Sequence, residues 1–188
     1  MSDRLSRLGI PFAILLIIVA TGGGAIPLHA QSGPVVSFEP ANFTVAAGEE
    51  QTLEVKIGGS HDLGGFQFDL LFPPGSISLS RAAVGPLLSS TGRSALPLGP
   101  ANESGRISFG GFTFGETAGA GGDGVLAVLV LRGETPGHGE LRLDRVQVLD
   151  IQGNDLKPTI ASAGTVEVTG SGPAATVTPG PHPDHRYR

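Results

Sequence analysis

The strongest constraint on the fold is an alternation of apolar and other residues in the middle of the chain. In the stretch GFQFDLLFPP, every second residue from Phe66 to Phe72 is large and apolar. A period of two places successive side chains on opposite faces of a β-strand, so this stretch is predicted to be a strand with one buried face. Pro73 follows at once, and proline cannot continue a β-ladder. The sequence leaves open whether the other face meets water or a partner.

Similar short runs fill the chain between Val35 and Thr169, and turn sequences such as PPGS, TPGHG and QGND separate them. The expected strands are 35–40, 43–48, 51–59, 66–72, 76–85, 106–114, 124–133, 140–150 and 165–169, and 86–100 is expected to be a loop with one short edge strand. This spacing, without a helical period, predicts an all-β fold, an antiparallel jelly-roll β-sandwich of about nine strands. The expected core residues are Phe66, Phe68, Leu70, Phe72, Leu126, Val128, Val130, Leu141 and Leu143.

The two ends of the chain differ from the middle. Residues 1–30 begin with Arg4 and Arg7, continue with the apolar run IPFAILLIIVA and end in a small residue. This pattern is typical of a signal peptide cleaved after Ala30, and an uncleaved membrane anchor is the alternative. Either one predicts that the domain, residues 31–169, is secreted or lies at the cell surface. Residues 170–188 are rich in Pro, Thr and Gly and are predicted to be a disordered tail.

Composition and motifs argue against several classes of function. The chain has no Cys, which excludes disulfides, thiolate metal sites and a cysteine nucleophile. A net charge of −5 without a Lys/Arg cluster argues against nucleic-acid binding. The sequence contains no nucleophile elbow, zinc-protease motif or phosphate-binding loop, so no catalytic residue is assigned and the protein is not expected to be an enzyme. The pair His61-Asp62 is interpreted as a turn in which the aspartate caps backbone amides.

Two features of the sequence bear on metal binding and on carbohydrate binding. The run DIQGND, residues 150–155, offers acids and a glycine but lacks the spacing of an EF-hand loop, and a hairpin turn at Gly153-Asn154 explains it more simply. No metal is therefore assigned to this chain. Flat sugar-binding faces usually carry Trp or Tyr, but the chain has no Trp and its single Tyr lies in the tail. A β-bulge at Gly110-Gly111 would expose Phe112 or Phe114.

The order of these segments resembles that of a cohesin domain, the receptor module that holds dockerin modules in cellulosomes and related assemblies. The resemblance covers residues 35–169 and is carried by GEEQTLEVKIGG, LGGFQFDLLFPP, GRISFGGF, GDGVLAVLVLRG, PGHGELRLDRVQVLD and GTVEVT, in that order. The chain departs from the usual aromatic-Asp-Pro of cohesins at Phe72-Pro73-Pro74. It also carries one such module and no dockerin loop, and so is more similar to lone cohesin-like modules of secreted proteins than to a cellulosome scaffold.

The resemblance implies a nine-stranded jelly roll that binds a dockerin-type partner through a sheet face, with calcium on the dockerin and no cofactor on this chain. In cohesins the third, fifth, sixth and eighth strands build this face. Carried onto this sequence, the outward residues are Gln67, Asp69 and Leu71, then Arg106 and Ser108, then Arg142 and, after an expected irregularity at Asp144-Arg145, Gln147. The fifth strand is expected within 94–98, with no residue assigned. The resemblance also suggests a role in polysaccharide-degrading or cell-surface assemblies. A carbohydrate-binding module and a structural or adhesion module are the alternatives.

Overall fold

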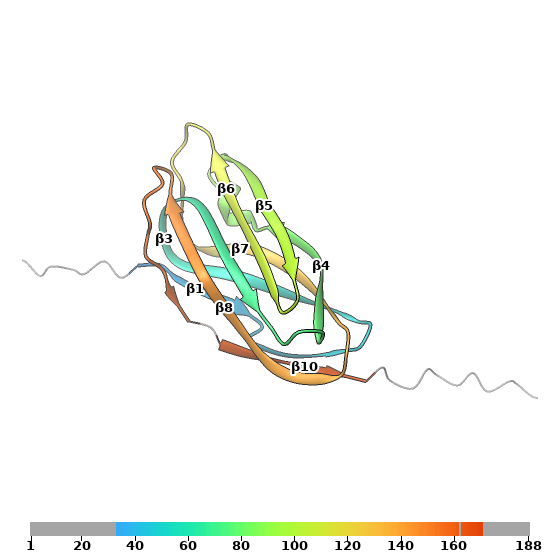
Figure 1. The fold of residues 1–188 in the computed structure, drawn as a ribbon. Helices are drawn as coiled ribbons and strands as arrows, with labels where there is room; N and C mark the ends of the chain where they lie inside the picture. The colour runs from blue at the N-terminus through green and yellow to red at the C-terminus, as the bar shows by residue number, and fades with distance from the viewer. Residues whose placement is uncertain (1–32, 162, 171–188) are drawn as a thin grey trace, which may run out of the picture. The chain divides into compact units, whose positions relative to one another are not determined.

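The computed structural model describes residues 33–161 and 163–170, so the expected signal peptide and the expected tail beyond Gly170 lie outside the described residues. The described chain is almost entirely β-structure (Figure 1). Its elements are β1 Val35–Glu39, β2 Asn42–Ala46, β3 Glu50–Leu71, β4 Ile77–Val84, the short 3-10 helix η1 Pro86–Ser89, β5 Ser94–Glu103, β6 Arg106–Phe114, β7 Ala120–Gly133, β8 Gly137–Asp150, β9 Thr159–Ile160 and β10 Ala163–Thr169. None of the described residues form a helix that is long and apolar enough to cross a membrane. The all-β prediction is confirmed, with ten strands in place of about nine.

β3 is the central element because it takes part in both layers of the sandwich. Residues 50–58 pair with β1 and β7, whereas residues 63–71 pair with β6 and β8. The sequence suggested two strands separated by a turn, but β3 continues through this segment. Its pairing with β7 is irregular there, and Gly59 and Asp62 have positive φ angles of 69° and 49°. Such irregularities bend a strand, and here they carry β3 from one layer to the other.

The two layers have different strand orders. One runs β9-β1-β3-β7-β4, and the other runs β2-β10-β8-β3-β6-β5. Most neighbouring strands are antiparallel, as predicted. The β1–β9 and β2–β10 pairs are parallel, so the sandwich is mixed and not purely antiparallel.

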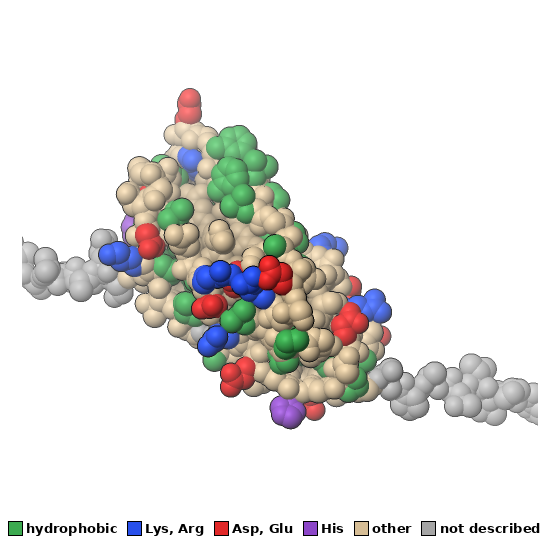
Figure 2. Space-filling model, viewed as in Figure 1, with side chains coloured by type: hydrophobic (Ala, Val, Ile, Leu, Met, Phe, Trp, Pro, Cys, Tyr) green, Lys and Arg blue, Asp and Glu red, His purple; other side chains and the backbone are tan. Residues whose placement is uncertain are grey.

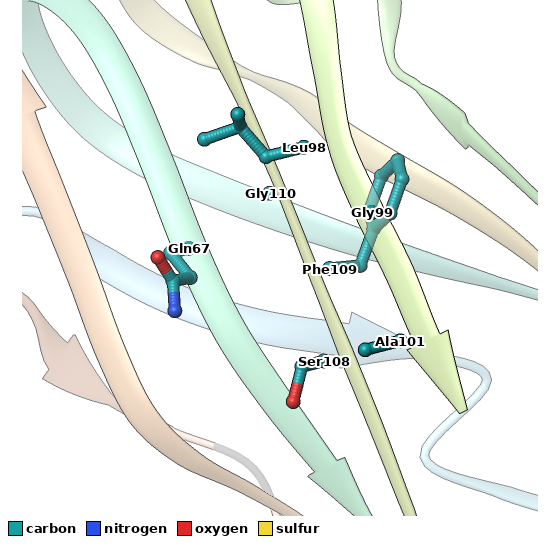
Figure 3. Close-up of a pocket in the computed structure, with 7 residues that line it drawn as sticks. All are labelled: Gln67, Leu98, Gly99, Ala101, Ser108, Phe109 and Gly110. Atoms are coloured by element: carbon teal, nitrogen blue, oxygen red, sulfur yellow. The ribbon is translucent and has the colours of Figure 1, made fainter. Parts of the chain in front are cut away.

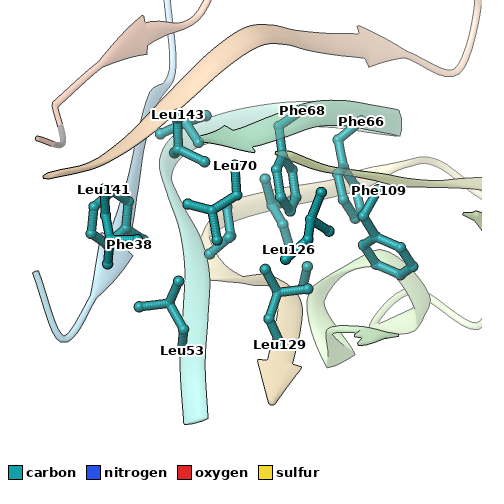
Figure 4. Close-up of a cluster of buried hydrophobic side chains, with 14 of the residues drawn as sticks. Phe38, Leu53, Phe66, Phe68, Leu70, Phe109, Leu126, Leu129, Leu141 and Leu143 are labelled. Carbon is teal, nitrogen blue, oxygen red and sulfur yellow. The ribbon is translucent and has the colours of Figure 1, made fainter. Parts of the chain in front are cut away.

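The core lies between the layers and contains the side chains that the alternation placed there. Phe66, Phe68, Leu70 and Phe72 are all buried, as are Leu126, Leu141 and Leu143. The rings of Phe66 and Phe68 lie with their centroids 6.0 Å apart, and Phe109 of β6 packs against both (Figure 4). Each such side chain contributes about 1.5–3 kcal/mol to folding when it is fully buried.

One residue of the predicted core, Val128, is wrong, whereas Val130 is buried as predicted. Val128 is partly exposed, and Val130 is buried but lies outside the central cluster, whereas Ala127, Leu129 and Leu131 are fully buried. The cause is a β-bulge at Leu126, because Val55 pairs with Ala127 while the next residue of β3 pairs with Val125. One extra residue shifts the alternation by one position, which moves the following side chains to the opposite face.

The turn interpretation of residues 150–155 agrees with the structure, whereas His61-Asp62 lies inside β3 and not in a turn. Asp150 accepts backbone hydrogen bonds from Gln152 and Asn154, both at 2.8 Å, in a turn where Gly153 has a φ of 86°. The hydrogen bond from the Asn154 side chain is the main cause that lowers the pKa of the Asp150 carboxyl below its ordinary value of 3.8. Asp62 caps a neighbouring loop, because it accepts the backbone N–H of Gly119 at 2.7 Å.

Candidate functional site

The outer surface of β8, β3, β6 and β5 is the face on which the residues predicted from the sequence meet (Figure 2). Antiparallel pairing sets these strands side by side in that order, and the surface is called the β8-β3-β6-β5 face below. Cross-strand neighbours form four rows: Leu149, Gly65, Phe112 and Leu96; Gln147, Gln67, Gly110 and Leu98; Asp144, Asp69, Ser108 and Ala101; Arg142, Leu71, Arg106 and Glu103. The face therefore changes from an apolar end to a charged end along the strands.

The seven residues assigned from the sequence all belong to these rows, but their exposure differs. Gln67, Arg142 and Gln147 are exposed. Leu71, Arg106 and Ser108 are half-buried, so Leu71 is less available than the strand pattern suggested. Asp69 points toward the face and is nevertheless only 1% exposed.

Asp69 is buried because Arg145 covers it. Asp69 Oδ1 accepts a hydrogen bond from Ser108 Oγ at 2.6 Å, and Oδ2 accepts one from Arg145 Nε and also pairs with Arg145 Nη2. The Arg145 side chain itself is 60% exposed. The structure thus differs from the expectation that Asp69 is an accessible outward residue: Arg145 presents the charged group at this position.

A β-bulge in β8 places Arg145 over Asp69. Gln67 pairs with Gln147 and Asp69 pairs with Asp144, so three steps on β8 match two steps on β3. Arg145 is the extra residue and has a φ of 45°, in the left-handed region. The irregularity expected at Asp144-Arg145 is confirmed. Sequence reasoning did not identify Arg145 itself, because the direction of a bulged side chain does not follow from alternation.

The apolar end of the face was only partly anticipated. Leu96, Leu98, Phe112 and Phe114 are between 39% and 51% exposed and are called the apolar patch below. Figure 2 shows hydrophobic side chains gathered at the end of β5 and β6. The pairing of β6 with β3 is uninterrupted, so the alternation alone exposes both phenylalanines and no bulge at Gly110-Gly111 is needed. β5 is a ten-residue edge strand, longer than the short strand expected between η1 and Pro100.

Two open hollows lie next to each other on the face. The first is lined by Gln67, Leu98, Gly99, Ala101, Ser108, Phe109 and Gly110 (Figure 3). The second is lined by Gln67, Asp69, Ser108, Arg145, Val146 and Gln147. Gly110 is required in this hollow because a Cβ at this position would lie 2.6 Å from the carbonyl oxygen of Phe66 on the neighbouring strand β3. Hollows that are this open to solvent fit side chains of a protein partner better than a small substrate, which usually binds in an enclosed pocket.

The comparisons with known proteins identify the fold. No family model and no curated protein matches the chain. A non-cellulosomal cohesin from the archaeon Archaeoglobus fulgidus matches with a TM-score of 0.56 and 20% identity over 73% of this chain and 92% of that chain. A type II cohesin from the cellulosome of Acetivibrio cellulolyticus matches with a TM-score of 0.59 and 12% identity over 71% and 95%. A chain of a type I cohesin–dockerin complex from Clostridium thermocellum matches with a TM-score of 0.57 and 16% identity over 73% and 92%.

The fold is that of a cohesin. The resemblance stated from the sequence is therefore confirmed at the level of a cohesin-like module. Within the residues described, no group of three or more His, Cys, Asp or Glu side chains is placed to hold a metal ion. The chemistry that this cohesin fold offers on its β8-β3-β6-β5 face is a combination of apolar contact, amide hydrogen bonding and arginine charge.

Proposed function

We propose that this protein is a non-catalytic receptor module that docks a dockerin-type protein through the β8-β3-β6-β5 face. The observation that carries the proposal is the apolar patch, which stands on an open sheet face beside rows of amide and charged side chains. Protein interfaces commonly combine an apolar centre with a polar rim. Among the similar structures, complexes of cohesins with dockerins from Clostridium thermocellum support the choice of partner.

The residues of the face divide into three groups in this proposal. The apolar patch supplies the contact area that leaves water on binding, which is the main source of affinity. Gln67, Ser108 and Gln147 supply hydrogen bonds beside it, and Arg106 and Arg142 form the charged end on either side of Leu71. Asp69 acts through Arg145, which covers its carboxylate.

The proposal also includes the calcium of the partner and the location of the module. Calcium in the complex would belong to the dockerin, and this chain would need no cofactor. Secretion or display at the cell surface rests on the signal-like residues 1–30. A role in polysaccharide-degrading or cell-surface assemblies follows from that location and from the nature of the partner.

The direct test is binding of the purified protein to dockerin-containing proteins of the same organism, in calcium and in chelator. We expect binding in calcium and its loss in chelator, because the dockerin needs the ion to fold. The chelator arm includes the cohesin-like protein alone, whose thermal unfolding should not change. Absence of binding to every dockerin by a folded sample would contradict the proposal.

Carbohydrate binding is the second candidate, and the exposure of Phe112 and Phe114 is the observation that favours it. Exposed aromatic rings can stack on sugar rings, although Trp and Tyr are the usual choice. A pull-down on insoluble polysaccharides separates the two functions. A dockerin receptor stays in the supernatant, whereas a carbohydrate-binding module is found in the pellet and loses this property in the Phe112→Ser, Phe114→Ser double variant.

A further inference from the structure

Arg145 has an unusual position, because its guanidinium is fixed on one side and open on the other. We propose that Arg145 is the specificity-determining residue of the β8-β3-β6-β5 face and that it binds a carboxylate side chain of the partner protein, bridging this group to the buried Asp69. The inference rests on the proposed function, since it concerns the same face. It names the chemistry that the partner has to bring to the polar part of this face.

The geometry of the guanidinium supports a second carboxylate. Asp69 occupies Nε and one N–H direction of Nη2, which is one side of the planar group. Within the described part of the chain, Nη1 has no hydrogen-bond partner. The outer edge formed by Nη1 and Nη2 therefore keeps the two parallel N–H groups that match a carboxylate. Arg145 can thus hold one carboxylate on each of two edges.

The surroundings of Arg145 add further donors. Gln67 and Gln147 line the same hollow, both are exposed, and neither side-chain amide has a hydrogen-bond partner among the described residues. The acceptor at the floor of the hollow, Asp69, is already engaged by Ser108 and Arg145. A partner that approaches this hollow therefore meets the unengaged N–H groups of Arg145, Gln67 and Gln147 together with the two glutamine amide oxygens, so Arg145 is the group that favours a carboxylate.

The charges around the hollow are compatible with an added carboxylate. Arg145 compensates Asp69, and Arg106 forms an ion pair with Glu103. Arg142 and Asp144 lie just before Arg145 on β8, and neither has an ion pair among the described residues, so their charges balance and the face carries no net negative charge that would repel a carboxylate. Asp144 is half-buried between these two arginines and is the acidic group nearest in sequence.

The position of the hollow fixes what accompanies the carboxylate. The hollow shares Gln67 and Ser108 with the neighbouring one, which Leu98 of the apolar patch lines. The same segment of the partner therefore has to carry apolar side chains next to its Asp or Glu. Burial against the apolar patch removes water from the ion pair and strengthens it.

A test that needs no natural partner uses sodium acetate as the carboxylate probe. NMR spectra of the 15N-labelled protein would follow the side-chain Nε–Hε signal of Arg145 during titration, with acetamide and sodium chloride as matched probes. We expect a saturable shift of Arg145 and of the Gln67 and Gln147 amide signals in acetate alone, several-fold larger than the shift of Arg81, an exposed arginine on β4. Equal shifts of Arg145 and Arg81 would overturn the proposal.

A second test uses any dockerin that binds the wild-type protein. Arg145→Gln is expected to weaken this binding at least tenfold. Arg145→Lys is expected to cause a large part of that loss, because an ammonium group lacks the two parallel N–H groups of a guanidinium. Arg81→Gln is expected to have no effect. Replacing the dockerin Asp or Glu that contacts Arg145 by Asn or Gln should cause little further loss of affinity when it is combined with Arg145→Gln. Failure of the proposed function appears as no binding by the wild-type protein. Failure of the present inference appears as equal binding by wild type and by a folded Arg145→Gln or Arg145→Lys variant.

Discussion

Phe112 of β6 and Leu96 of β5 are direct cross-strand neighbours, and both side chains face solvent. They form the centre of the apolar patch. The double variant Leu96→Ser, Phe112→Ser is expected to lower partner affinity at least tenfold, because central apolar side chains carry much of the binding energy of an interface. Surface plasmon resonance with the cognate dockerin measures this loss.

The matched control for the apolar patch lies on the other layer. Val35 and Ile160 are 42% and 44% exposed, on β1 and β9. The double variant Val35→Ser, Ile160→Ser removes a similar kind of exposed surface and is expected to leave affinity unchanged. If both double variants bind equally well, the partner does not contact the apolar patch.

Asp69 and Arg145 provide a prediction about stability that is separate from binding. Arg145→Ala leaves a buried carboxylate with Ser108 as its remaining partner, so we expect the free energy of unfolding to fall by about 1–3 kcal/mol. Arg142→Ala, on the same strand but without an ion pair among the described residues, should change it by less than about 0.5 kcal/mol. Urea denaturation measures both values, and equal effects would show that Arg145 does not support Asp69.

The Asp150 turn provides a prediction about pH. The pKa of Asp150 is lower in the folded protein than its ordinary value of 3.8, so its contribution to the turn is present above that value and is lost as the pH falls through the lower folded value. The amide NMR signals of Gln152 and Asn154 should therefore keep their positions near neutral pH and move only in acid. In Asp150→Asn this transition should disappear, and an unchanged profile would exclude Asp150 as its source.

The bulge at Leu126 can be tested through two neighbouring residues of β7. Leu129 is fully buried, so Leu129→Ala is expected to cost about 2–5 kcal/mol of unfolding free energy. Val128 is partly exposed, so Val128→Ala should cost less than about 1 kcal/mol. Thermal and urea unfolding compare the two variants. A larger effect at Val128 would show that Val128, and not Leu129, faces the core, as the sequence pattern predicts.

The alternation predicted the sandwich and the buried face of Phe66 to Phe72 because a period of two follows directly from strand geometry. It failed where one extra residue enters a strand. At Leu126 the bulge exchanged the two faces of β7, and the sequence carries no mark that distinguishes this residue from its apolar neighbours. At Arg145 a bulge was expected, but its effect on Asp69 depends on a contact between two strands far apart in sequence.

For the candidate site as well, the strand positions of the residues followed from the sequence, but the exposure of their side chains did not. The residues assigned from the family resemblance lie in adjoining rows because the pairing of β8, β3 and β6 follows the cohesin arrangement. Their exposure did not follow from sequence, as the burial of Asp69 shows. The exposure of Leu96 and Leu98 was also not predicted, since β5 lies at the edge of the sheet and its proline-containing sequence has a weak strand pattern.

The passage of β3 through both layers has a consequence for cooperativity. β3 forms ladders with β1 and β7 in one layer and with β6 and β8 in the other. Unfolding of β3 therefore removes the central strand of both layers at once. The layers are therefore not independent units, and the β8-β3-β6-β5 face should melt together with the opposite sheet in a single two-state transition. A variant that weakens either layer lowers the fraction of molecules able to bind, without touching the interface.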